Sequence, residues 1–392
     1  MFNPKKCMNP WTDLQINYDG TYGVCCYHVP FQRETDDLAA LWNSDAVKEM
    51  RENIINYDKI DSICHHCAMH RMSFVNLSDE YFKNALDFID DKMIKQKRNI
   101  ALAKKNFDEK RINTDHRPVK IYLNFGMKCN LSCIMCSQMN LRKQHKEILN
   151  PEFLFKQVDF LSHASEITII GGEPFVLKPA LDFLNFCSEH KELKNTQFNI
   201  TTNGTVIDRH IDLLKKFKHL FVSFSIDSYG KYYEKIRLGA TWEKVSKNVE
   251  MIHKNSKQHS GWLTPSIGSI VMKSGLPGLY DLCKWAVSNK LALGFGRVFD
   301  DADPSIKKEN IFEYPNELDD IPEWQNIFRD CIAFLYKNNY DTPANQLYWY
   351  FSSITMGEIY KIQRDILLKS RWRRLGIALG IVKKHDFEYE KK

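Results

Sequence analysis

The sequence lacks a long apolar segment near either end. Residues 1–11 contain no apolar run of the kind found in a secretory signal peptide. The longest late apolar run, Leu375–Val382, is too short to cross a bilayer. Internal repeats and low-complexity segments are also absent. We therefore expect a cytoplasmic protein of ordinary globular composition, and its 392 residues are enough for two or three domains.

Cysteine, by contrast, is plentiful, with eleven in the chain. Disulfides are rare in the cytosol, so these residues are interpreted as metal ligands or buried thiols. Eight of them form two groups with the spacing of metal ligands. The other three, Cys187, Cys283 and Cys331, lie in apolar stretches and are expected to be small buried hydrophobic side chains.

The first group has the spacing Cys-x3-Cys-x2-Cys and consists of Cys129, Cys133 and Cys136. It follows Val119–Phe125, a β-branched and aromatic run that predicts a buried strand, so the cysteines are placed on a loop that leaves a strand. Three thiolates can hold three irons of an iron–sulfur cube and leave the fourth open. Structural zinc, the alternative, needs a fourth ligand, and none is obvious directly after Cys136.

With this spacing, the sequence resembles the radical S-adenosylmethionine (SAM) enzymes. The resemblance implies a catalytic [4Fe-4S] cluster whose open iron binds the amino and carboxylate groups of SAM. It also implies reductive cleavage of SAM to a 5′-deoxyadenosyl radical, with electrons from an external donor such as flavodoxin or ferredoxin. The usual aromatic residue before the third cysteine is replaced by Met135, which is expected to pack near the adenine.

The second group lies near the N-terminus. Two short strands are predicted, one over residues 13–17 and one ending in Cys25 and Cys26, with a turn at Asp19-Gly20 between them. A hairpin followed by a later Cys-x2-Cys pair is a common way to complete a four-thiolate site, for an iron–sulfur cluster or for structural zinc. Cys26 is an alternative to Cys25, because adjacent strand residues face opposite sides of a sheet. The candidate ligands are Cys7, Cys25, Cys64 and Cys67.

The spacing of Cys7, Gly20 and Cys25 resembles the opening of the SPASM and twitch domains, which bind auxiliary clusters in many radical SAM enzymes. The later cysteines of the full SPASM pattern are missing here. The resemblance is therefore to the shorter twitch type and implies one auxiliary [4Fe-4S] cluster. These domains usually follow the core, so a position in front of it departs from the family pattern.

Strand and helix patterns alternate between residues 119 and 299. Such alternation predicts an α/β fold with a parallel sheet and right-handed crossovers, and it places functional loops at the carboxyl ends of the strands. The resemblance implies a partial (β/α)6 barrel. The expected strands are residues 120–125, 166–170, 197–201, 221–226, 267–272 and 291–298, and the expected helices are residues 154–162, 178–190, 206–216, 242–255 and 279–288.

Four regions are expected along the chain. They are an auxiliary cluster domain (1–75), a charged helical linker (76–117), the radical SAM core (118–300) and a mostly helical C-terminal region (301–392). Residues 361–392 carry ten Lys and Arg against four Asp and Glu. This basic tail fits an acidic membrane surface, a phosphate-bearing substrate, or a solvated terminal helix packed on the barrel.

Polar motifs follow three of the expected strands. After the second strand, Gly171 and Gly172 allow close backbone approach, and Glu173 can accept hydrogen bonds from an ammonium group. They match the GGE motif of the family, which contacts the amino group of SAM. After the third strand, Thr202 and Asn203 are further SAM candidates, or a turn with a helix cap. The remaining candidates are Ser225, Asp227 and Arg237, each of which fits a direct SAM contact or a structural hydrogen bond.

The motifs together predict that the radical removes a hydrogen atom from a substrate in the barrel mouth, in a net oxidation assisted by the auxiliary cluster. The twitch-type spacing favours a small polar alcohol of the sugar or aminocyclitol kind. Maturation of a ribosomally made peptide is the alternative, and a tRNA methylthiotransferase-like activity is a further one, although binding to nucleic acid is not expected from the hairpin pattern and helical tail. A non-catalytic metal-binding protein is the rival from another class. No residue is assigned to proton transfer.

Overall fold

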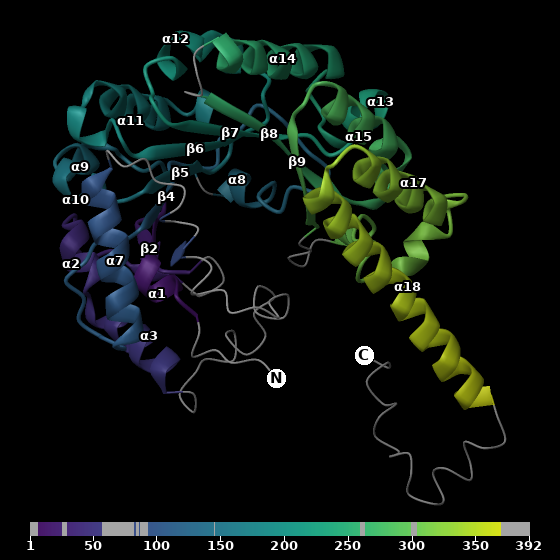
Figure 1. Cartoon of the computed structure of the whole chain (residues 1–392), viewed down its shortest axis with the longest axis horizontal. Helices are drawn as coiled ribbons and strands as arrows, with labels where there is room; N and C mark the ends of the chain where they lie inside the picture. The colour runs from purple at the N-terminus through teal and green to yellow at the C-terminus, as the bar shows by residue number, and fades with distance from the viewer. Residues whose placement is uncertain are drawn as a thin grey trace, which may run out of the picture.

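A computed structural model describes residues 7–25, 30–56, 82, 83, 86, 93–144, 146–258, 263–298 and 304–369. In these ranges nine strands form one curved sheet, with α11, α12 and α14 on its outer side (Figure 1). The strands lie in the order β3-β2-β1-β4-β5-β6-β7-β8-β9. Their bounds are β1 (Asp13–Ile16), β2 (Thr21–Gly23), β3 (Phe31–Gln32), β4 (Lys120–Asn124), β5 (Glu166–Ile170), β6 (Gln197–Thr202), β7 (Leu220–Ser225), β8 (Leu263–Val271) and β9 (Ala292–Arg297).

The predicted α/β alternation is confirmed. From β4 to β9 each strand pairs in parallel with its successor in the chain. In β5 the alternating residues Ile167 and Ile169 are fully buried, as expected for a strand with one face on the core. The helices of this region are α11 (Lys178–Glu189), α12 (Ile211–Leu214), α13 (Gly230–Ile236), α14 (Trp242–Gln258) and α15 (Leu279–Ser288).

Two expected helices are shorter than the sequence indicated. Residues 154–162 form two short helices, α9 (Glu152–Phe155) and α10 (Val158–Leu161). Between them the Gln157 amide donates to the Leu154 carbonyl at 2.9 Å, a tight i to i+3 bond that interrupts the α-helical ladder. Residues 206–216 likewise begin as a 3₁₀ turn, η5 (Ile207–His210), before α12. Apolar periodicity indicates which residues are buried. Because α-helices and 3₁₀-helices can both bury such residues, it does not distinguish between them.

The N-terminal hairpin is part of the core sheet. β1 pairs in parallel with β4, with Asp13 opposite Lys120 and Ile16 opposite Leu123. β2 then pairs antiparallel with β1. The turn between them contains Gly20 at a φ of +79°, a left-handed conformation that favours glycine. The expected hairpin is therefore present, and it extends the parallel sheet at its β4 edge.

A buried arginine ties the residues that lead into this hairpin to those that precede β4. Arg51, on α3 (Asp45–Ile55), is fully buried and donates to the carbonyls of Pro10, Trp42 and Ile112 at 2.8, 3.0 and 2.9 Å. Burial lowers its pKa to about 9. The neighbouring helices are α1 (Asn9–Thr12), α2 (Leu38–Trp42) and α7 (Ile94–Asp108), the last of which lies inside the expected linker at residues 76–117.

The other edge of the sheet is covered by helices. The main chain of Phe295 in β9 donates to the Gln346 side chain at 2.9 Å and accepts from the Tyr350 hydroxyl at 3.1 Å. Both partners lie on α18 (Asp341–Lys369), which packs beside α17 (Trp324–Lys337). Covering an edge strand in this way prevents pairing with another strand. The C-terminal region also contains α16 (Pro304–Lys307), while the basic tail beyond residue 369 lies outside the described residues.

No helix in the described ranges has the length and apolar character needed to cross a membrane.

Candidate functional site

The cysteine triplet lies on the loop that leaves the carboxyl end of β4, as the sequence predicted. The loop is fixed by backbone hydrogen bonds to the residues around the end of α13. The Ser132 amide donates to the Leu238 carbonyl and the Ile134 amide to the Ile236 carbonyl, both at 3.0 Å. Cys133 is buried between these two anchors, while Cys129 and Cys136 are partly exposed. The loop is therefore held in place by the polypeptide itself.

Gly171 and Gly172 lie against the start of the cysteine loop. The Gly172 amide donates to the Gly126 carbonyl, and the Glu173 amide to the Lys128 carbonyl, each at 2.9 Å. A Cβ on Gly172 would collide with the carbonyl oxygen of Lys128, and one on Gly171 would lie 2.5 Å from that of Gly126. Gly171 also has a φ of +126°, which other residues rarely adopt. Both glycines are needed for this backbone contact.

The Glu173 carboxylate is fully buried and accepts three hydrogen bonds within the protein. Its Oε1 accepts from the Thr202 hydroxyl at 2.7 Å and the Phe175 amide at 3.2 Å, and its Oε2 accepts from the Asn203 amide at 2.7 Å. Burial raises its pKa, and the donors from Asn203 and Thr202 oppose this rise. Glu173 thus fastens the loop after β6 to the loop after β5. Its Oε2, with one donor, retains acceptor capacity.

Asp227 and Arg237 form a buried ion pair beside the cysteine loop. Arg237 Nε donates to Asp227 Oδ2 at 2.7 Å, and the other oxygen of Asp227 accepts from the Ile270 amide at 2.9 Å. Burial opposes the charged form of Arg237, but the attraction of Asp227 outweighs it and raises the pKa of Arg237. A structural hydrogen bond, one of the two roles expected from the sequence, therefore describes the Arg237 Nε contact.

Each of the three cysteine sulfurs has an N–H group of another side chain nearby. Asn203 Nδ2 lies 3.7 Å from Cys129 Sγ, Arg237 Nη1 lies 3.8 Å from Cys133 Sγ, and Arg142 Nη2 lies 3.1 Å from Cys136 Sγ. These three donors come from three different segments of the chain. Such N–H groups stabilise negative charge on sulfur.

Sequence reasoning missed Arg142. The residue lies on α8 (Leu141–Gln144), one short turn beyond the cysteine loop. Its guanidinium folds back, so that Nη1 donates to the Leu131 carbonyl at 2.8 Å while Nη2 contacts Cys136. In the sequence Arg142 is one of several basic residues in a polar stretch, and only the fold distinguishes it from Lys143.

The donor set fits an anionic iron–sulfur cluster. Thiolates are soft ligands suited to such a cluster. Burial raises the pKa of the Cys133 thiol, whereas the Arg237 charge opposes the rise and favours the thiolate. Arg142 Nε is buried and has no hydrogen-bond acceptor, which fits a site that takes an anionic group. No three His, Cys, Asp or Glu side chains of the described ranges are grouped for a single metal ion, but each cysteine of a cluster binds a separate iron.

The other predicted SAM contacts lie around the same loop. Thr202 and Asn203 belong to the Glu173 network, and Asn203 also donates to Asn130 at 3.0 Å. Ser225 ends β7 and is partly exposed. Met135 packs against a small apolar cluster that includes Ile236 and Met272. The structure brings all of these residues to the carboxyl ends of the parallel strands.

The described N-terminal cysteines lie at the opposite end of the sheet. Cys25 follows β2 and adds to the rise in the pKa of Asp13, the first residue of β1. Burial is the main cause of that rise and, together with smaller influences, brings the pKa to about 7. Cys7 lies two residues before the start of α1, which leads into β1. The other predicted ligands of this site, Cys64 and Cys67, and the alternative Cys26 lie outside the described residues.

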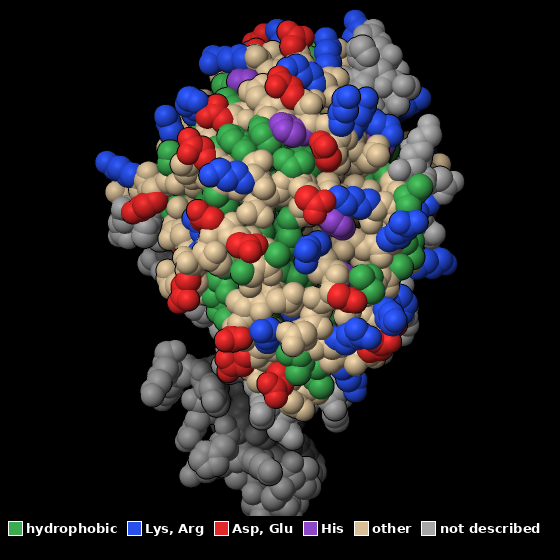
Figure 2. All heavy atoms as spheres, turned by 90° about the vertical axis from the view of Figure 1, so that its left-hand side faces the viewer, with side chains coloured by type: hydrophobic (Ala, Val, Ile, Leu, Met, Phe, Trp, Pro, Cys, Tyr) green, Lys and Arg blue, Asp and Glu red, His purple; other side chains and the backbone are tan. Residues whose placement is uncertain are grey.

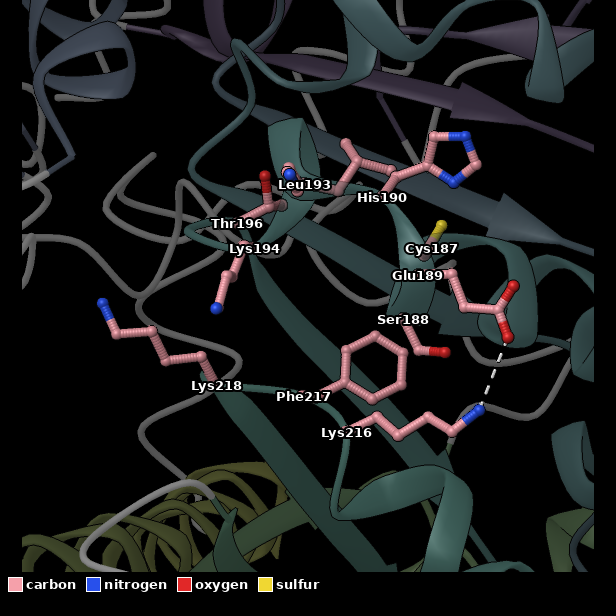
Figure 3. A pocket seen from close by; sticks show the side chains of 11 residues that line it. Cys187, Ser188, Glu189, His190, Leu193, Lys194, Thr196, Lys216, Phe217 and Lys218 are labelled. Carbon is pink, nitrogen blue, oxygen red and sulfur yellow. Dashed lines mark ion pairs between the residues drawn. The ribbon is translucent and has the colours of Figure 1, made fainter.

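A cavity of about 180 Å³ is distinct from this site. It is lined by lysines that include Lys194 and Lys218, and by Lys216 and Glu189, which form an ion pair of 3.5 Å (Figure 3). Lys194 precedes β6 and Lys218 precedes β7, so the cavity lies at the amino ends of these strands. On the face shown in Figure 2, basic and acidic side chains are interspersed, as is usual for a solvated surface.

Comparisons with known proteins distinguish the two cysteine groups. Residues 123–267 match the profile of the radical SAM superfamily, and residues 7–68 match that of the SPASM iron–sulfur cluster-binding domain. Residues 7–68 contain all the cysteines of the N-terminal group, so the expected order, with the cluster domain in front, is confirmed.

Individual relatives share only part of the chain. "Probable GTP 3′,8-cyclase" of Methanococcus maripaludis is 25% identical over 169 residues, which cover 41% of this chain and 54% of that protein. GTP 3′,8-cyclase of Alkaliphilus oremlandii is 30% identical over 129 residues, or 31% of this chain and 39% of that protein. The chain thus spans about half the length, or less, of these relatives.

Among solved structures, that of Streptococcus suis SuiB bound to S-adenosylmethionine is similar, with 15% identity and a TM-score of 0.44 over 76% of this chain and 65% of that one.

Proposed function

Because the chain belongs to the radical SAM superfamily and carries a SPASM iron–sulfur cluster-binding domain, we propose that Cys129, Cys133 and Cys136 hold its catalytic cluster. Its cofactors are SAM and [4Fe-4S] clusters, one of them the auxiliary cluster of the SPASM domain. The observation that carries the proposal is the docking of the cysteine loop, with an N–H donor directed at each sulfur. When bound, cluster and SAM supply a 5′-deoxyadenosyl radical that removes a hydrogen atom from the substrate.

The chain contributes binding and orientation. Backbone contacts of Gly172 and Glu173 hold the loop at Gly126 and Lys128, so a small displacement of either loop would move the cysteines. The Ser225 hydroxyl has no hydrogen-bond partner among the described residues and lies at the carboxyl end of β7, where a polar group of SAM would reach it. Glu173 Oε2 is the acceptor proposed for the SAM ammonium group.

The auxiliary cluster is proposed to bind Cys7, Cys25, Cys64 and Cys67, within a domain formed by residues 1–75. Cys25 lies near Asp13, which pairs with Lys120 at the amino end of β4, whereas the catalytic loop leaves the carboxyl end. The five residues of β4 span about 13 Å at 3.3 Å per residue, so Cys25 and the catalytic loop are separated by at least about this distance along the strand. The separation favours a role as an electron relay over direct contact with the substrate.

We propose a peptide segment as the substrate. The N-terminal region matches the SPASM profile, and SPASM-containing enzymes include those that modify ribosomally made peptides, whereas the twitch-type spacing had favoured a small polar alcohol. The GTP 3′,8-cyclases act on a nucleotide by their names, but they share only part of the chain. A low-potential donor such as flavodoxin or ferredoxin would supply electrons.

Metal analysis after anaerobic purification tests the cluster assignment. The wild type is expected to hold about eight irons, and the Cys129→Ala, Cys133→Ala, Cys136→Ala triple variant about four. The control is the Cys187→Ala, Cys283→Ala, Cys331→Ala triple variant. These three thiols are buried outside both cysteine groups, so the iron content of this variant should equal that of the wild type. One zinc and no iron in the cluster variant would mean that the N-terminal site is structural.

A second experiment addresses the substrate. Formation of 5′-deoxyadenosine is measured with reduced wild-type protein and SAM, in the presence of peptides, of sugars and aminocyclitols, or of tRNA. Stimulation by peptides alone supports the proposed substrate. Stimulation by the small alcohols would restore the prediction made from the cysteine spacing, and a response to tRNA would favour the methylthiotransferase-like alternative.

A further inference from the structure

Arg142 differs from the other cation of the site in how its charge is balanced. Arg237 is paired with the buried carboxylate of Asp227 at 2.7 Å. In the described part of the chain no carboxylate pairs with Arg142, whose guanidinium contacts the Leu131 carbonyl, Cys136 Sγ and, at 3.9 Å, Met139 Sδ. A partly buried guanidinium without a carboxylate favours an anion nearby. Cys136, at 3.1 Å, is the group in that position.

Hydrogen bonds fix the backbone that carries the Arg142 side chain. The Arg142 amide donates to the Gln138 carbonyl at 2.9 Å, and the Met139 amide donates to the Cys136 carbonyl at 3.1 Å. These bonds turn the chain back on itself directly after the third cysteine. The planar fork of Arg142 then spans the cysteine loop from Leu131 to Cys136, a geometry that a lysine ammonium does not reproduce.

The third nitrogen of the fork indicates what the site accepts. Arg142 Nε is buried without a hydrogen-bond acceptor, and leaving a buried donor unpaired is unfavourable. Because Nη2 of the same group contacts Cys136, an anionic acceptor bound at this sulfur would lie within reach of the fork. Cluster sulfide and the SAM carboxylate share that chemistry.

We propose that Arg142 is a positioning residue that holds Cys136 and makes the catalytic cluster easier to reduce. A positive N–H donor at a ligand sulfur stabilises the oxidation state with more negative charge, which is the reduced one. The electron comes from the external low-potential donor, and no bond to Arg142 is made or broken. The inference rests on the proposed function, because that function assigns Cys136 to the cluster.

Redox titration followed by electron paramagnetic resonance tests the inference. The signal that changes when SAM is added reports the catalytic cluster. In Arg142→Met the ratio of reduced to oxidised cluster at a fixed potential should fall about tenfold, which is 59 mV for a one-electron couple. Arg142→Lys, which keeps the charge without the fork, should lie between this variant and the wild type. Lys143→Met, an exposed change on the same short helix, should match the wild type.

The outcomes separate the two proposals. An unchanged midpoint potential in Arg142→Met, with normal iron content, would overturn the role of Arg142 while the proposed function stands. If Arg142→Met loses iron, Arg142→Lys decides, since a wild-type potential there overturns the role and a lowered one supports it. Failure of the wild type to bind a SAM-sensitive cluster would overturn the proposed function itself.

Discussion

The two ends of the parallel sheet hold their buried cations in different ways. At the amino end Arg51 is surrounded by acceptors of the polypeptide, namely three carbonyl groups and the Asn43 side chain. At the carboxyl end Arg142 and Arg237 lie against cysteine sulfurs, and Arg142 keeps one buried donor without an acceptor. The first arrangement is complete within the protein and secures the fold. The second is suited to an additional anionic group, so changes at the two ends should affect different properties.

The largest effect should come from Gly172→Ala at the carboxyl end. A Cβ at this position collides with the Lys128 carbonyl and lies 2.5 Å from that of Met127, so the cysteine loop must move. We expect loss of the catalytic cluster and a fall in SAM cleavage of at least about 10²-fold. Iron content and 5′-deoxyadenosine formation measure this.

Gly294→Ala in β9 is the matched control, because a Cβ there meets no atom within 4 Å. It should retain the iron and the activity of the wild type. Retention of the full iron content by Gly172→Ala would mean that the contact between the two loops does not determine the site.

Arg51→Met should affect stability and leave the catalytic cluster in place. Three buried carbonyls lose their donor, which should lower the free energy of unfolding by about 3 kcal/mol. Chemical denaturation measures the loss, with Lys48→Met, a partly exposed residue on the same helix, as the control. A more stable variant would show that the cost of desolvating the guanidinium outweighs its hydrogen bonds. Loss of the SAM-sensitive cluster would show that the amino end also determines the catalytic site.

Much of the framework was predictable because its signals are local. The bounds expected for β5 and α15 agree with the structure, since alternating burial and helical periodicity are written into those residues. The loop positions of the three cysteines and of Gly171 and Gly172 also followed from the strand order. These predictions needed no knowledge of distant contacts.

Other features depend on contacts between distant segments. The pairing of β1 with β4 joins residues more than a hundred positions apart, so an N-terminal hairpin in the core sheet was not foreseen. Glu173 was predicted to contact SAM, and the fold adds three donors to its carboxylate, from Phe175 in its own loop, from Thr202 at the end of β6 and from Asn203 directly after it. Arg142 became visible only when the fold placed it against Cys136.

The pH dependence of the free energy of unfolding reports on the amino end of the sheet through His116. It is buried, its Nε2–H donates to the Trp11 carbonyl at 2.7 Å, and its Nδ1 has no partner. Burial lowers its pKa from 6.5 to about 4, so between these values the unfolded chain binds a proton that the folded protein does not. The free energy of unfolding from this residue is therefore fully present above pH 6.5 and falls as the pH drops toward 4.

The expected loss at pH 5 is about 2 kcal/mol relative to neutral pH. The free energy of unfolding is measured by denaturation at pH 7 and at pH 5. Its decrease between these two pH values should be smaller by this amount in His116→Gln, whose side-chain amide can still donate to the Trp11 carbonyl. An equal pH dependence in the two proteins would mean that His116 does not remain neutral in the folded state.

The smallest effect is expected from Ser225→Ala at the carboxyl end. If the hydroxyl donates to a polar group of SAM, its removal should cost about 1 kcal/mol, or about a fivefold increase in the Kd of SAM. Calorimetric titration of SAM into reconstituted protein measures it, and Ser223→Ala, two residues earlier on the same face of β7, is the control. Equal Kd values for Ser225→Ala and the wild type would leave the binding of SAM to the backbone and to the Glu173 and Arg237 side chains. The difference between the two ends of the sheet would then be clearer, because the carboxyl end would bind SAM through the same groups that fix its loops.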